Sequence, residues 1–406
     1  MAHQKALDHL REAITFERCK QLLIELVRVP SPQTELLEAE PLLRKFIETA
    51  VEPRLRASGI TNIRYDAMGN LIARHGAASS GRSLMLIMNA MNQPQATMVN
   101  AYAGDVTDGA PHGLPGEVVL GKGASEQKSN MAAMMAAVET VLASGVAITG
   151  ELVLLCCLSG ETGRHDAIQS MIEGCGVRAD MAVLGGTSLM ASFGNRGRLD
   201  VVVKVHGVPS HSSRPHDGCN AITGAIEAIR RLSTGIKLIR RDANLGPESL
   251  TVNRIRSTPE STHTIQSLCE FSIDRRLLPG DDPDVAFAEI AKVAGAVDGM
   301  KDPASGKPWR IEVIKGAFMY PSLVTRDSPV VEALFAACKQ VLGREPEVFY
   351  APNAFDQGYL NHVGIPCVNW GPGEYKFAHT DLDLASVERT RDAAIVFAAM
   401  ILNRLA

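Results

Sequence analysis

Three short runs of uninterrupted apolar residues constrain the fold of this chain most strongly. They lie at residues 84–88, 152–158 and 181–184. Runs of this length and character are typical of strands that are buried on both faces of a parallel sheet. An Ala- and Met-rich stretch at 130–142 predicts a helix between the first two strands. Strands that alternate with helices in this way indicate an α/β fold with a mostly parallel sheet.

The pattern changes near residue 199, which indicates an inserted domain. Residues 200–206 alternate like a half-exposed strand, and two helices and three more strands follow. These are a helix at 219–235, strands at 249–256 and 263–275, a helix at 283–296 and a strand at 309–314. This β-α-β-β-α-β order is that of a ferredoxin-like α+β domain. The α/β pattern resumes at about residue 329. We therefore expect a catalytic domain at 1–198 and 315–406 with an inserted domain at 199–314.

Composition argues against two classes of function. The 406 residues carry 41 Lys and Arg against 45 Asp and Glu, a formal net charge of −4, so no basic face is expected for binding the phosphates of nucleic acid. No apolar run is long enough to span a bilayer, and the N-terminus lacks the apolar core of a signal peptide. The eight cysteines have no CxxC or zinc-finger spacing, so reduced, buried thiols are expected. We expect a cytoplasmic protein that binds neither nucleic acid nor membrane.

Six short motifs occur in a characteristic order along the chain. They are Gly121-Lys-Gly-Ala-Ser-Glu-Gln-Lys128, Gly160-Glu-Thr-Gly163, Gly207-Val-Pro-Ser-His-Ser-Ser-Arg-Pro215 with Gly218-Cys-Asn-Ala221, Asp274-Arg-Arg-Leu-Leu-Pro279, and Gly364-Ile-Pro366 leading to His379. Together they resemble the dinuclear-zinc deacylases and exopeptidases that include acetylornithine deacetylase, succinyl-diaminopimelate desuccinylase and carboxypeptidase G. The resemblance covers nearly the whole chain. It implies a metallopeptidase-like catalytic domain, an inserted dimerisation or lid domain, and a homodimer.

The resemblance also implies two metals that share one bridging carboxylate. Glu126 matches the bridging position, where the family usually has Asp, and Glu161 and His379 match the other ligands of the first metal. Two carboxylates and one imidazole leave a position open for water or substrate, as a catalytic metal site requires. We therefore expect one divalent metal, zinc or manganese, since this ligand set suits both.

The residues implied for the second metal are replaced in this chain. Its histidine and the aspartate that orients it align with Asn89 and Met91, and its remaining ligand aligns with Gly185 or Gly186. The catalytic base aligns with Gly160. Because the loss of a general base typically lowers the rate about 10²–10⁴-fold, ordinary peptide hydrolysis is not expected.

Polar residues near these positions are candidates for contact with a substrate. Asn89, Asn92 and Gln93 would line the vacated second-metal position, and their amides suit a polar substrate group better than a cation. A polar loop after a strand is the alternative. His165 and Asp166 are the nearest replacements for the missing base, although a solvated helix start explains both more simply.

Three residues of the inserted domain are further candidates. In the family, the histidine that matches His211 reaches the active site of the partner subunit and polarises the substrate carbonyl; the alternative is a loop histidine at an interface. His263 replaces the family's oxyanion-side Asn and offers an imidazole that can act as acid, base or donor. Arg276 is either an anchor for the substrate or the partner of Asp274 in a strand-end ion pair.

These observations predict a metal-dependent hydrolase that cuts a carbon–nitrogen bond in a small, carboxylate-bearing molecule through a mononuclear site. Because the peptidase base is missing, an activated bond is favoured. An amide, a lactam, an imide and an electron-poor aromatic amine of the 5-nitroanthranilate type are all candidates. Two other interpretations stay open. One is an inactive homologue that binds a small ligand, and the other is a metal-free enzyme that uses His263, His211 or Glu161 as acid and base.

Overall fold

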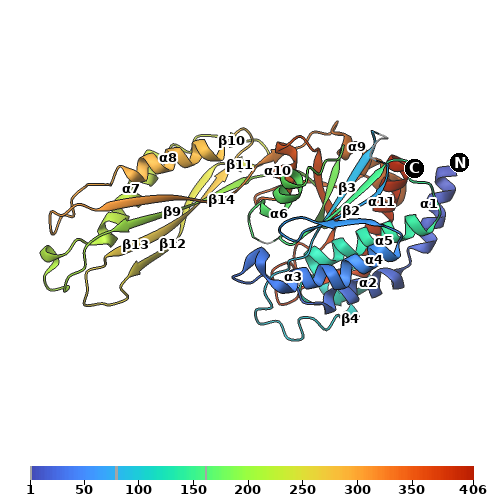
Figure 1. Cartoon of the computed structure of the whole chain (residues 1–406), viewed down its shortest axis with the longest axis horizontal. Helices are drawn as coiled ribbons and strands as arrows, with labels where there is room; N and C mark the ends of the chain where they lie inside the picture. The colour runs from blue at the N-terminus through green and yellow to red at the C-terminus, as the bar shows by residue number, and fades with distance from the viewer. Residues whose placement is uncertain (1, 78–80, 161) are drawn as a thin grey trace. The chain divides into compact units, whose positions relative to one another are not determined.

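The computed structural model describes residues 2–77, 81–160 and 162–406, which divide into two compact units (Figure 1). Unit 1 comprises Met1–Phe193, Val324–Phe349 and Tyr359–Ala406, and unit 2 comprises Gly194–Leu323 and Tyr350–Gly358. The sequence pattern assigns residues 350–358 to the catalytic domain, whereas their contacts are made mainly within unit 2.

The larger sheet contains nine strands among the described residues and is mixed rather than mostly parallel. Its order is β1 (Asn62–Tyr65), β2 (Leu71–Gly76), β6 (Glu151–Cys157), β3 (Ser83–Asn89), β7 (Ala182–Thr187), β17 (Cys367–Gly373), β8 (Ala191–Asn195) and β15 (Ser322–Leu323), with β16 (Val348–Ala351) also paired to β8. Parallel pairing joins β6, β3, β7 and β17. The apolar runs seen in the sequence are β3, β6 and β7 of this parallel centre.

Helices cover the parallel centre of unit 1. Helix α5 (Ser129–Ala143) packs on β3, β7 and β17, and helix α11 (Val387–Leu405) packs on α5 and on the same region of the sheet (Figure 1). Nearly every residue of α5 is buried, because a helix enclosed by a sheet and other helices is apolar on all sides. The other helices of the unit are α1 (Ala2–Ala13), α2 (Phe16–Arg28), α3 (Pro41–Phe46), α4 (Glu52–Ala57), α6 (Asp166–Gln169), α9 (Pro329–Leu342) and α10 (Asp356–His362), the last of which begins in unit 2.

A small three-stranded sheet brings two distant segments of unit 1 together. Its order is β18 (Leu384–Ser386), β5 (Glu117–Leu120) and β4 (Asp105–Asp108), and β18 pairs with β5 so that Leu384 lies opposite Leu120. The residues just before β18 therefore lie beside the residues just after β5. This small sheet was not expected from the sequence.

Unit 2 has the ferredoxin-like arrangement that the sequence predicts. Its antiparallel sheet has the order β12 (Ser249–Thr258), β13 (Leu268–Leu277), β9 (Gly197–His206) and β14 (Arg310–Met319). Helices α7 (Ala221–Gly235) and α8 (Pro283–Gly295) lie side by side on this sheet (Figure 1). A two-stranded hairpin of β10 (Arg241–Asp242) and β11 (Gly246–Pro247) is added.

The predicted strand at 263–275 begins later than expected. Residues 263–267 pair instead with the loop around His211: Ser212 N donates to His263 O at 2.9 Å and His211 forms a bridge with Thr264. Strand β13 starts only at Leu268.

No helix among the described residues is long and apolar enough to cross a membrane.

Candidate active site

The candidate site lies at the edge of the sheet where the four parallel strands end. Asn89 is the last residue of β3, Gly160 follows β6, Gly185 lies in the second half of β7, and His379 follows β17. The register places Asn89 opposite Cys157 of β6. This carboxyl edge is where open α/β sheets bind their ligands.

Glu126 lies on a π-helical turn, Ala124–Lys128, which leads directly into α5. The turn starts at Gly123, whose φ is 86°, a left-handed conformation that side chains other than hydrogen strain. A β-carbon on Gly123 would also lie 2.8 Å from Asn92 Cβ. Lys128 N closes the turn on Gly123 O at 2.8 Å. Single π-turns of this kind occur frequently at functional sites.

Asp383 joins the glycine motif to the segment that carries His379. Its carboxylate accepts hydrogen bonds from Gly123 N at 2.7 Å and Ser125 N at 2.8 Å. Lys122 Nζ donates to Thr380 O at 2.7 Å across the same junction. Burial raises the pKa of Asp383, while the two backbone N–H groups lower it. The carboxylate therefore ties the turn that carries Glu126 to the segment that carries His379.

His379 and Glu126 meet at this junction. His379 Nε2 lies 3.2 Å from Glu126 Oε2, and the side chains are 54% and 29% exposed. His379 has a φ of 62°, an unusual backbone conformation that persists where the surrounding structure imposes it. Two ligands about 2.0–2.1 Å from one tetrahedral metal lie roughly 3.3 Å apart. The separation is therefore that of a direct imidazole–carboxylate ion pair and is also compatible with two ligands of one divalent metal.

The third expected ligand, Glu161, lies outside the described residues. Among the residues that are described, no group of three His, Cys, Asp or Glu side chains converges. The structure thus brings together two of the three residues that the sequence assigns to the metal.

The glycines that the sequence aligns with the missing base and with a second-metal ligand lie against asparagines. A β-carbon on Gly160 would lie 2.8 Å from Asn89 Cβ, and one on Gly185 would lie 2.8 Å from Asn130 Cβ. Asn130 Nδ2 donates to Gly186 O at 2.9 Å and also to Glu126 O, and Asn130 Oδ1 accepts from Gly186 N at 3.0 Å. The residues at the positions aligned with a second metal do not fit one, because they carry no carboxylate or imidazole and Asn130 lies against Gly185.

Asn92, expected to touch substrate, and His165, a candidate base, have environments that differ from those predicted. Asn92 is 1% exposed, accepts from Ser31 Oγ at 2.8 Å and donates to Gln93 O at 2.6 Å, so it supports its loop rather than lining an open site. Gln93 beside it is half-buried. His165 is also buried, at 4% exposure, with its ring 5.4 Å from that of Tyr359; a solvated helix start therefore describes Asp166 but not His165.

The candidates in unit 2 are placed as follows. His211 and His263 are both exposed and belong to adjoining loops. His211 Nδ1 lies 2.8 Å from Ser213 Oγ. Arg276 forms a two-point ion pair with Asp274, with contacts of 2.8 and 2.9 Å, which is the strand-end pair that the sequence offered as the alternative to substrate anchoring.

Two buried ionisable groups near the glycine motif were not predicted from the sequence. Burial raises the pKa of Glu374 to about 7, although Arg389 Nη1 lies 2.7 Å from its carboxylate and opposes the shift. Burial lowers the pKa of Lys128 to about 7; its Nζ donates to Val29 O at 3.0 Å. The burial of a single Glu or Lys gives no signal in the sequence, because it depends on the tertiary fold.

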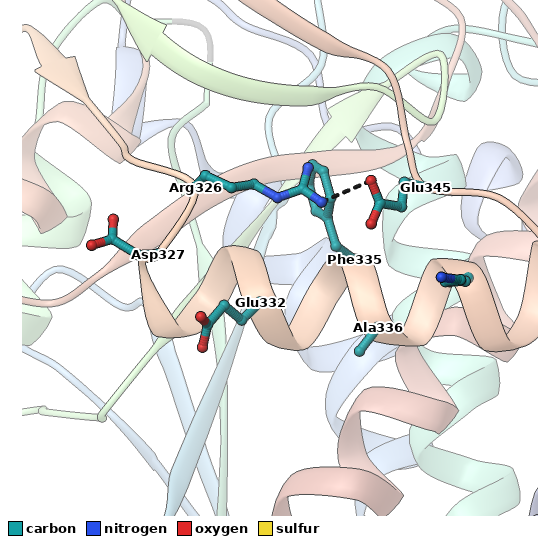
Figure 2. Close-up of a pocket in the computed structure, with 7 residues that line it drawn as sticks. Arg326, Asp327, Glu332, Phe335, Ala336 and Glu345 are labelled. Atoms are coloured by element: carbon teal, nitrogen blue, oxygen red, sulfur yellow. Dashed lines mark ion pairs between the residues drawn. The ribbon is translucent and has the colours of Figure 1, made fainter.

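A separate hollow of about 510 Å³ in unit 1 is lined by Arg326, Asp327, Glu332, Phe335, Ala336, Lys339 and Glu345 (Figure 2). Arg326 lies over the ring of Phe335 at 4.1 Å and pairs with Glu345 at 2.7 Å (Figure 2). Both charged groups are about half exposed. The hollow shares no residue with the Glu126–His379 pair, so we do not regard it as the reaction site.

Comparison with known proteins supports the same assignment of fold. A family model described as a peptidase dimerisation domain matches residues 193–299. The protein YgeY of Escherichia coli (strain K12) is 25% identical over 99% of this chain and 97% of its own length. Succinyl-diaminopimelate desuccinylase of Phenylobacterium zucineum (strain HLK1) is 25% identical over 84% of this chain and 87% of its own.

A solved structure shows the same fold over most of the chain. The M20 family metallo-carboxypeptidase Sso-CP2 from Sulfolobus solfataricus matches with a TM-score of 0.73 at 17% identity, covering 94% of this chain and 97% of that one. Residues 193–299 therefore match a peptidase dimerisation domain, and the fold of most of the chain is similar to that of this metallo-carboxypeptidase.

Proposed function

We propose that this protein is a metal-dependent hydrolase that cuts a carbon–nitrogen bond in a small, carboxylate-bearing molecule with one divalent metal, zinc or manganese. The observation that carries the proposal is the 3.2 Å contact of His379 Nε2 with Glu126 Oε2 at the carboxyl edge of the parallel strands. Glu161 would be the third ligand, on the strength of its position in the Gly160–Gly163 motif. Relatives with hydrolase names, among them the desuccinylase, favour the same reaction class.

The residues of the site would have separate roles in this reaction. Glu126 and His379 would hold the metal, which would lower the pKa of a bound water and polarise the reacting centre. Asp383 fixes the separation of these two side chains through its bonds to Gly123 and Ser125. In the net reaction a C–O bond forms from water, the C–N bond breaks, and the nitrogen leaves with a proton.

The glycine at position 160 limits the substrate. Gly160 has no side chain to take a proton from water, and the carboxylate of Glu374 is already paired with Arg389. A group that takes the proton typically contributes about 10²–10⁴-fold to the rate. We therefore favour a lactam, an imide or an electron-poor aromatic amine, whose carbon is more open to attack than that of a peptide.

Unit 2 would make the protein a homodimer. The matched dimerisation domain, residues 193–299, supports this. The exposed loops that carry His211 and His263 are then the parts of unit 2 that would act on substrate, with Arg276 held by Asp274 at a strand end.

The deciding experiment is the metal content per chain, measured on protein purified without added metal or chelator. We expect about one equivalent in the wild-type protein and in a His9→Ala control, which removes an exposed histidine of α1, and little or none in His379→Ala. Circular dichroism establishes that the variants are folded. If no metal is present and neither Zn²⁺ nor Mn²⁺ is taken up on titration, the proposal fails and a ligand-binding homologue or a metal-free enzyme is left. Two equivalents would overturn the mononuclear site.

A further inference from the structure

We propose that Asn89 accepts a hydrogen bond from an N–H group of the substrate, so that the protein selects carbon–nitrogen bonds whose nitrogen carries hydrogen. Primary and secondary amides, lactams, imides and aromatic amines belong to this class. Amides whose nitrogen is fully substituted do not. The inference rests on the proposed function, because it names the class of substrate that the same site takes.

The starting observation is an unsatisfied acceptor. Asn89 Oδ1 is buried and has no hydrogen-bond partner among the described residues. Buried amide oxygens are nearly always paired in native proteins, and each exception calls for an explanation. A donor brought by a ligand is the explanation that fits a residue at the end of a central parallel strand.

Gly160, Asn130 and Met91 offer Asn89 no free side-chain donor. Gly160 lies against Asn89, with a β-carbon there only 2.8 Å from Asn89 Cβ, and it has no side chain. Asn130 has committed both hydrogens of its amide nitrogen to the carbonyl oxygens of Glu126 and Gly186. The residue two positions after Asn89 is Met91, which is apolar and fully buried. The acceptor is thus left without a partner at the position that the sequence aligns with the histidine of a second metal.

The chemistry of the position favours a neutral N–H over a cation. A divalent metal needs several charged or strongly donating ligands, and only a single amide oxygen is offered here. An N–H group on the substrate needs only that one acceptor. Because Asn89 and the Glu126–His379 pair lie at the same edge of the sheet, a ligand bound at that edge can present its nitrogen to Asn89.

Two small imides test the inference. Succinimide carries an N–H between two carbonyl groups, and N-methylsuccinimide replaces that hydrogen with a methyl group. Their binding to the wild-type protein and to Asn89→Leu, an apolar substitution of similar shape, can be measured by ligand-observed NMR. We expect the wild-type protein to bind succinimide about tenfold more tightly than its N-methyl derivative, and Asn89→Leu to reduce that ratio to about one.

The four measurements form a double-mutant cycle that separates hydrogen bonding from steric exclusion. If the methyl group is merely too large for the site, the tenfold ratio persists in Asn89→Leu, and the inference is overturned. A wild-type protein that binds both imides equally, or binds neither up to their solubility limits, also overturns it.

Metal content distinguishes failure of this inference from failure of the proposed function. Asn89→Leu should keep the metal content of the wild-type protein, because Asn89 is not a ligand in the proposal. A loss of metal in Asn89→Leu would assign Asn89 to the metal and reject its role as an acceptor for substrate. Conversely, metal-free wild-type protein that still distinguishes the two imides through Asn89 would reject the hydrolase while retaining the N–H subsite.

Discussion

Asn130 takes the space beside Gly185: a β-carbon added to Gly185 would lie 2.8 Å from the β-carbon of Asn130. The contact involves the first atom of each side chain, so rotation of Asn130 about its own bonds cannot relieve it. A side chain larger than hydrogen at position 185 would therefore require Asn130 to shift its backbone.

Replacing Gly185 by alanine should consequently destabilise the protein by about 1–3 kcal/mol, the usual cost of overfilling a packed position. Gly174→Ala is the matched control, because a β-carbon on Gly174 would meet nothing within 4 Å, and a change within about 0.5 kcal/mol is expected there. Denaturant unfolding measures both. Equal stability of the two variants would show that Asn130 moves aside without cost.

Asp383→Asn should weaken the metal site more than it weakens the fold. An asparagine side chain has one oxygen instead of two, so it can accept from Gly123 N or from Ser125 N but replaces the other contact with an N–H facing an N–H. The loss of a group that orients metal ligands typically lowers metal affinity about 10–100-fold.

The control for this substitution is Asp381→Asn, two residues away in the same segment, since Asp381 is exposed and accepts from Thr97 Oγ1 rather than from the glycine motif. Metal titration of both variants provides the measurement. If the two variants bind metal equally well, Asp383 does not position Glu126 and His379.

Glu374 should make the protein less stable as the pH rises. Its folded pKa is raised from 4.5 to about 7, so between these values the folded state holds a proton that the unfolded state has released. Stability from this group is complete below about pH 4.5 and declines until about pH 7, by an amount on the order of 3 kcal/mol. Relative to the wild-type protein, Glu374→Gln should therefore gain stability between pH 5 and pH 8.

The comparison with Glu374→Gln is needed because Lys128 also titrates near pH 7 in the folded state and changes the stability of the protein in the opposite direction. Its pKa is lowered from 10.5 to about 7 in the folded state, so its contribution is lost as the pH falls from 10.5 to 7. Thermal unfolding of both proteins across this range isolates the contribution of Glu374. A difference in stability that does not change with pH would assign Glu374 an ordinary pKa.

Mixed dimers should reveal whether His211 acts on the partner subunit's site. If it does, equal amounts of His211→Ala and His379→Ala chains, unfolded and refolded together, should regain about a quarter of wild-type activity, because half of the dimers are mixed and each has one intact site. Each variant alone is expected to be inactive on any amide or imide that the wild-type protein hydrolyses. No recovery in the mixture would place the whole site in one chain.

The sequence predicts those parts of the fold that depend on local pattern. The apolar runs became β3, β6 and β7, and the alternating segments became the ferredoxin-like sheet of unit 2. The pairing of β18 with β5 could not be predicted, because strands of three and four residues give too short a pattern and their partners lie far apart in sequence. The start of β13 was missed since Thr264 pairs with His211 instead.

The candidate site was likewise predicted from the sequence only in part. Motif order was enough to associate Glu126 with His379, and their contact at 3.2 Å agrees with it. The importance of Asp383 and Asn130 could not be inferred, because each acts on backbone groups of a distant segment and such contacts leave no motif. The burial of Asn92 was missed for the same reason.

The position of β17 also bears on how the chain is made. In the finished sheet β17 pairs with β7 along its parallel edge, yet all of the segment Gly194–Leu323 is synthesised between the two strands. At about 5–20 residues per second, that interval lasts roughly 10–40 s on the ribosome. Throughout it, the nascent chain has an apolar strand edge with no partner, the kind of surface that invites pairing with other chains. Slow translation between residues 187 and 367 therefore lengthens the period in which this strand edge is exposed to pairing with other chains.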